Sequence, residues 1–187
     1  MGNASSALSN AIRLGTVAEV NLATARCRVQ VGEMLTDYLP WVVTLAGTTI
    51  IWSAPAIDEQ VVVLSPAGDL ADGVVLRGLY SDQFAAPAAS DTLHVLRFAD
   101  GAQIHYDTEA HALQATLPSG GTASITADGG ITLNGPLTVN GKTMLNGDAT
   151  ITGTAKATTD VIGGGISLKN HKTTGVTAGT ALSGGPQ

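Results

Sequence analysis

Residues 122–153 read TASIT-ADGG-ITL-NGP-LTV-NGK-TML-NGD-ATITG, in which a short strand pattern is followed each time by a turn built on Gly, Asn or Asp. Mostly Thr, Ser and Ala separate the large apolar residues, and such small residues are compatible with strands. Strands this short and this sparsely apolar cannot bury a face of their own. The repeat segment, residues 119–168, therefore predicts an oligomeric fibre in which other copies cover its large side chains: Ile125, Ile131, Leu133, Leu137, Val139, Leu145 and Ile151.

The composition of the 187-residue chain excludes several classes of protein. Charged residues make up only 13%, which fits a surface that partners largely cover. The net charge of −6 argues against a nucleic-acid binder that needs a basic groove. The single cysteine, Cys27, alternates with apolar residues and is expected in a core. No signal peptide is expected, and the longest apolar stretch, 39–52, is too short and too interrupted to span a bilayer.

The patterning predicts an all-β chain, apart from a short N-terminal helix over residues 1–13. Residues 14–82 contain five or six short strand patterns separated by Gly, Pro and Asn turns, which predicts a small closed barrel of the OB-fold type. The predicted strands are LGTVAEV, RCRVQV, LPWVVTL, TIIWS, QVVVLS and GVVLRGL. An Ala/Pro-rich linker (83–92) and a hairpin or meander (93–118) lead into the repeat segment, with VIGGGISL as its last strand, and residues 169–187 form a tail or a compact cap.

No arrangement of side chains indicates catalysis. His94, His105 and His111 lack metal-ligand spacing and are interpreted as surface or interface residues. The paired carboxylates at 58–59 and at 69 and 72 lie in turns, where acidic residues are ordinary. There is no GxSxG, P-loop or GxGxxG motif. The chain is therefore expected not to be an enzyme and to have no small-molecule substrate, and Trp41 and Trp52 are interpreted as barrel core or interface.

Several stretches together resemble the baseplate assembly protein V family, the central spike of contractile phage tails and R-type pyocins. They are GTVAEV with RCRVQV in 15–31, LPW at 39–41, Trp52 with Ala54-Pro55, DEQVVVLSPAGD at 58–69, and FADG with IHYD in 98–107. The resemblance implies a homotrimer: an OB-fold that docks to the tail hub, then an intertwined triple-stranded β-helix over 119–168 and a pointed apex over 169–187. It also implies that Ile166 and Leu168 join the seven residues above in the trimer core.

The resemblance further implies a mechanical role, in which sheath contraction drives the spike through the bacterial outer membrane. The protein would then belong to the tail baseplate of a virion or a tailocin particle, assembled in the host cytoplasm. No nucleic-acid partner is implied.

One departure from the family pattern concerns a metal. Such spikes carry His-x-His near the C-terminus, and three copies hold one iron ion on the three-fold axis. Here the stretch is Asn170-His171-Lys172-Thr173, so Thr173 replaces the second histidine. Three His171 side chains could still hold iron or another transition-metal ion, with water or an anion completing the shell, or pack on the axis without metal.

Two other interpretations remain open. One is an OB-fold binding module on a trimeric stalk that recognises a glycan or a nucleic acid. The other is a spike of the type VI secretion kind, although such chains are usually much longer.

Overall fold

The computed structural model describes residues 11–172 and residue 179 of the chain. It divides into two compact units, the first ending at Ile125 and the second beginning at Thr126. Within the described residues the only helical elements are two 3-10 turns, so the structure agrees with the all-β fold expected from the sequence. None of the described helices is both long and apolar enough to cross a membrane.

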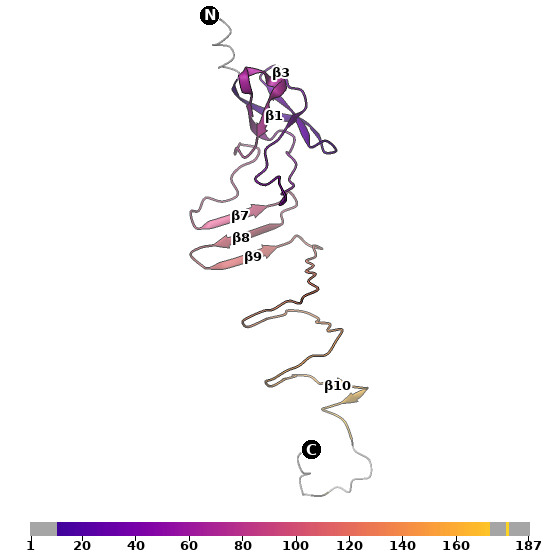
Figure 1. Cartoon of the computed structure of the whole chain (residues 1–187). Coiled ribbons are helices and arrows are strands. Elements are labelled where there is room, and N and C mark those ends of the chain that lie inside the picture. The colour runs from indigo at the N-terminus through magenta and orange to yellow at the C-terminus, as the bar shows by residue number, and fades with distance from the viewer. Residues whose placement is uncertain (1–10, 173–178, 180–187) are drawn as a thin grey trace, which may run out of the picture. The chain divides into compact units, whose positions relative to one another are not determined.

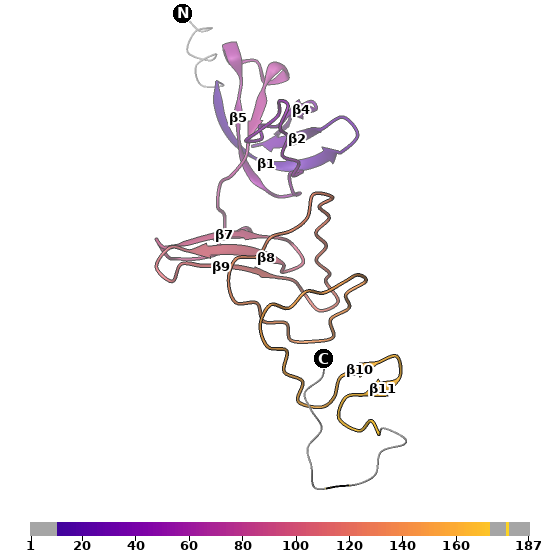
Figure 2. The same cartoon turned by 60° about the horizontal axis from the view of Figure 1, so that its bottom comes forward.

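Six strands of the first unit form a barrel of the kind expected for an OB domain (Figures 1 and 2). In sheet order they run β3-β2-β1-β5-β6, with β4 also paired to β2. The bridge between Trp41 and Val75 links the chain after β4 to β6 and thereby closes the sheet on itself. The strands are β1 (Ile12–Asn21), β2 (Arg26–Val31), β3 (Met34–Leu35), β4 (Leu39–Pro40), β5 (Gln60–Leu64) and β6 (Val74–Leu76).

Alternation along these strands builds the barrel core. Every second residue of β2 and of β5 is buried, as expected where one face of a strand lies inside. Gly15 lies where β1 and β2 approach closely: a Cβ there would be 2.5 Å from Val29 Cγ1 and 2.6 Å from the Gln30 carbonyl oxygen. The buried cluster comprises Val17, Cys27, Val29, Val31, Leu39, Val61, Val63 and Val75.

Two 3-10 turns, η1 (Pro66–Gly68) and η2 (Leu70–Asp72), connect β5 to β6. They lie at the Leu64 end of β5. The antiparallel pairing of β5 with β6 brings the chain back, so β6 ends at Leu76 opposite Val62, and the next residue, Arg77, forms an ion pair with Glu59. The barrel therefore has a 3-10 end and an opposite end at Glu59, from which the chain leaves toward residues 78–92.

A three-stranded antiparallel sheet follows, made of β7 (Leu93–Arg97), β8 (Gln103–Asp107) and β9 (Ala112–Thr116). Gly101, at φ +89°, sits in the turn between β7 and β8. Pairing in this register places Leu96 beside Ile104 and Tyr106 beside Leu113 on one face. All four side chains are exposed.

The second unit contains β10 (Ile162–Gly163) and β11 (Ile166–Ser167), which form one small hairpin (Figure 2). Gly164 and Gly165 have positive φ and make its turn. Between Thr116 and Ile162 the described chain contains no strand.

Three local predictions were wrong. Ile12 and Arg13, assigned to the N-terminal helix, pair with β5 as part of β1, while residues 1–10 of that helix lie outside the described residues. TIIWS is no strand: only an isolated bridge joins Ala46 to Ile50, because the chain leaves the barrel after Trp41. VIGGGISL is a hairpin rather than one strand, since its glycines adopt the left-handed conformation of a turn.

Candidate functional site

The large apolar residues of the repeat segment all face solvent in the single chain. Their exposed fractions run from 52% for Val161 to 78% for Ile125. A folded chain rarely leaves so regular a series of large apolar side chains uncovered. The series includes all nine residues predicted for the trimer core, in chain order Ile125, Ile131, Leu133, Leu137, Val139, Leu145, Ile151, Ile166 and Leu168.

Over residues 119–160 the backbone of this segment also has almost no partners in its own chain. Among residues 119–160, all of which the structure describes, backbone–backbone hydrogen bonds are confined to two tight turns, Gly121 N–H to the Pro118 carbonyl and Gly130 N–H to the Ala127 carbonyl. Backbone donors and acceptors that leave water must be paired. The segment thus offers both apolar side chains and backbone groups to partners that come from outside the chain.

Residues 160–171 differ, because they are organised by their own side chains. The Asp160 carboxylate accepts hydrogen bonds from the Ser167 hydroxyl and from the backbone N–H groups of Val161 (2.8 Å) and Lys169 (3.1 Å). These bonds favour the ionised carboxylate, and the bond from Ser167 contributes most to lowering the pKa of Asp160 below its ordinary value. This turn fixes the backbone immediately before His171.

His171 is exposed, and its ring is held by the same turn. Nδ1 lies 3.0 Å from the Leu168 carbonyl oxygen. Since a carbonyl oxygen only accepts, Nδ1 carries the proton in this hydrogen bond, and in the neutral imidazole Nε2 then holds the free lone pair. That is the arrangement in which a histidine ligates a metal through Nε2. One chain supplies a single such ligand, and within the described residues no three His, Cys, Asp or Glu side chains gather into a metal site. Thr173 lies outside the described residues.

The remaining histidines lie on or next to the three-stranded sheet. His94 and His111 are exposed, and His105 is half-buried on the sheet face opposite Tyr106. Asp107 accepts hydrogen bonds from the backbone N–H groups of Ala110 and Glu109, which lower the pKa of its carboxyl. This carboxylate therefore stabilises the turn between β8 and β9.

Two of the barrel carboxylates considered above, Glu59 and Asp69, have structural partners. Glu59 forms a two-pronged ion pair with Arg77, at 2.7 Å to Nε and 2.9 Å to Nη2. Asp69 accepts from the backbone N–H of Ala71 and begins η2. Cys27 is fully buried, and burial raises the pKa of its thiol to about 11, so the thiol stays protonated at neutral pH. The core assignment of Cys27 is confirmed.

One surface was not identified from the sequence. The apolar loop, residues 42–53, leaves the barrel after Trp41 and exposes large apolar side chains. Trp41 packs against the core, but Trp52 is exposed and has its ring centroid 5.7 Å from that of Trp41. A signal was present: no Asp, Glu, Lys, Arg or His occurs from Leu39 to Ile57.

Comparison with known proteins shows which family of domains the barrel matches. Residues 13–80 match the family model described as the type VI secretion system/phage-baseplate injector OB domain. The chain is also similar to the spike protein of Escherichia phage P2, with 46% identity over 124 residues. That match covers 66% of this chain and 57% of the relative, so the chain spans little more than half of that protein's length. Residues 13–80 therefore form the OB domain of the phage baseplate V family, and the chain is similar to a phage spike protein.

Proposed function

We propose that this protein is the central spike of a contractile-tail baseplate, a homotrimer that punctures the bacterial outer membrane when the tail sheath contracts. The observation that carries the proposal is the repeat segment, whose large apolar side chains are exposed and whose backbone has almost no partners in its own chain over residues 119–160. Three intertwined copies would satisfy both needs at once, as a triple-stranded β-helix over 119–168 that ends in an apex over 169–187.

Such a shaft suits a mechanical role. Strands that pair with strands of the other two copies leave no open edge along the needle. Apolar side chains from three copies meet on the axis, so a narrow cross-section still contains a continuous core. A needle of this kind transmits force and performs no chemistry, which is consistent with a protein that is not an enzyme.

The barrel would attach the spike to the tail hub and the baseplate. Support comes from the family description of residues 13–80 as an injector OB domain and from the similarity to a phage spike protein. The protein would then reside in the tail baseplate of a virion or of a tailocin particle and be assembled in the host cytoplasm.

At the apex, we propose that three copies of His171 hold one iron or other transition-metal ion. Support comes from the hydrogen bond of Nδ1 to the Leu168 carbonyl, which leaves Nε2 available and fixes the ring. An ion held there would tie the three chain ends together.

Light scattering on a sizing column tests the trimer. A molar mass near 56 kDa, three times 18.8 kDa, is expected. A mass of one chain would refute the proposal, because the repeat segment would then have no partner.

A second candidate is the spike of a type VI secretion system, since the matched family description names both machines. Gold-labelled antibody to the chain separates the two. Label at the tip of isolated phage-like tails supports the baseplate spike, and label confined to secretion sheaths in whole cells supports the second candidate.

A further inference from the structure

The apolar loop, residues 42–53, is a surface built for contact. Five of its large side chains are between 41% and 70% exposed, namely Val42, Leu45, Ile50, Ile51 and Trp52. Together they expose on the order of 500 Å² of apolar surface, which is as large as the largest patch on an ordinary monomer. The loop contains no ionisable group, so covering it would desolvate no charge.

The loop is held in place at both ends and across its middle. Val42 N–H donates to the Val75 carbonyl at 2.8 Å, and the Arg77 guanidinium donates to the Ser53 carbonyl at 2.6 Å. Within the loop, Ile51 N–H donates to the Leu45 carbonyl at 3.0 Å. Because these hydrogen bonds already order the loop backbone, binding of a partner would cost the loop little conformational entropy.

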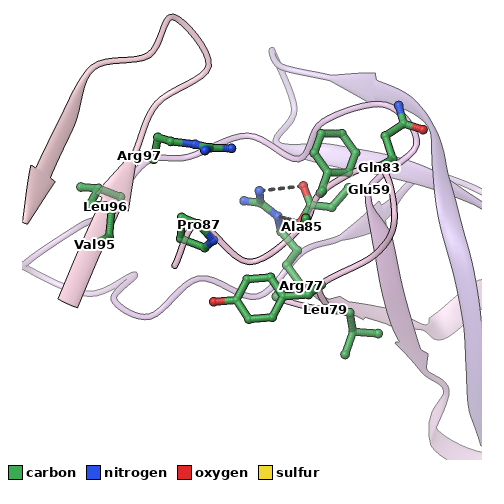
Figure 3. Close-up of a pocket in the computed structure, with 12 residues that line it drawn as sticks. Glu59, Arg77, Leu79, Gln83, Ala85, Pro87, Val95, Leu96 and Arg97 are labelled. Atoms are coloured by element: carbon green, nitrogen blue, oxygen red, sulfur yellow. Dashed lines mark hydrogen bonds and ion pairs between the residues drawn. The ribbon is translucent and has the colours of Figure 1, made fainter. Parts of the chain in front are cut away.

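A groove of about 490 Å³ lies at the Glu59 end of the barrel, next to Arg77 (Figure 3). The Arg77–Glu59 ion pair lines it from the barrel side. Arg97 reaches into it from β7, and its guanidinium has no hydrogen bond or ion pair within the described residues. Leu79, Phe84 and Leu96 supply the apolar part of the lining. The groove thus combines an apolar wall with one uncompensated positive charge.

We propose that the apolar loop of one copy fills the groove of the next copy, with Trp52 against the Arg97 guanidinium. The inference rests on the proposed trimer. Each copy has one loop and one groove, on the two sides of its own Arg77, so a head-to-tail contact repeated three times closes into a ring. The exposed ring of Trp52 is the best side chain for an unpaired guanidinium to contact.

The occupant is a second copy rather than a tail protein because of where the loop lies. Loop and groove are at the Glu59 end of the barrel, from which the chain continues toward β7 and the repeat segment. Three chains joined through their repeat segments approach one another at this end. The contact also has a useful size, since the loop contributes over half of the roughly 800 Å² per partner found in stable interfaces.

Photo-crosslinking in the full-length protein tests the contact. With p-benzoylphenylalanine in place of Trp52, irradiation is expected to yield covalent dimers and trimers whose crosslinked peptides fall in residues 77–97. The same probe in place of Met34, an exposed apolar residue of β3, serves as the control and is expected to give none. Arg97→Ala should lower the yield roughly tenfold, whereas Arg97→Lys should retain much of it.

The possible outcomes separate this inference from the proposed function. A trimeric mass with no crosslink between copies, or with equal crosslinking from the Met34 position, would overturn the loop–groove contact and leave the spike proposal standing. A monomeric mass would overturn both. In intact particles, crosslinks from position 52 to a different tail protein would assign the loop to that partner and also overturn the inference.

Discussion

Replacing Ile131 by serine tests whether the repeat segment has an intermolecular core. In the single chain this side chain is 57% exposed, so about 100 Å² of it is available for burial by other copies. At about 25 cal/mol per Å², losing that burial costs roughly 2.5 kcal/mol per copy and roughly 7.5 kcal/mol per trimer. A cavity on the three-fold axis would increase the cost further.

Thermal unfolding monitored by circular dichroism, with light scattering at each temperature, measures this effect. Ile131→Ser should lower the melting temperature of the trimer by on the order of 10 °C, while Lys142→Ser, at an exposed position of the same segment, should change it little. Val139→Asp should be at least as damaging as Ile131→Ser, since it places three carboxylates on the axis. Equal melting temperatures for all three variants would refute the intermolecular core.

Three further predictions concern other parts of the chain. Gly15→Ala should destabilise the barrel by roughly 1–3 kcal/mol, because its Cβ would overlap β2, whereas Gly47→Ala, with open space around it, should be near neutral in the same denaturant titration. The pKa of Asp160 is lowered in the folded turn, so its contribution to stability is present above the ordinary Asp pKa and is lost as the pH falls through the lowered value. Hydrogen exchange of residues 161–169 should follow that pH dependence in the native chain but not in Asp160→Asn. Elemental analysis after mild purification should find one transition-metal ion per three chains and none in His171→Ala; less than one in the native protein would remove the metal proposal.

The barrel was largely predictable because its signal is local. In β2 and β5, every second residue is apolar and buried, so alternation alone identified Cys27 as core, and Val29 and Val31 lie on the same face of β2. The same rule failed at TIIWS, where an equally apolar run belongs to a loop. Whether an apolar segment enters the core depends on strand pairing, and here the bridge from Trp41 to Val75 closes the barrel before that segment is reached.

Each candidate site likewise has one part that the sequence predicted and another part that only the structure revealed. That the repeat segment lacks a core of its own followed from the sequence, because one or two large apolar residues per short strand cannot cover themselves in any single-chain arrangement. His171 was singled out through the resemblance to the baseplate V family, but the bond that orients its ring required the turn built by Asp160 and Ser167.

The sequence by itself thus determined which parts of this protein can bury apolar surface alone and which cannot, since that depends on composition and spacing within a few residues. Only the tertiary structure decided that Glu59, Arg77 and Arg97 converge on one groove and that the apolar loop stands beside it. The apolar loop and the residues that line the groove come from segments up to 55 positions apart in the sequence, from Val42 to Arg97. Only closure of the barrel brings them together.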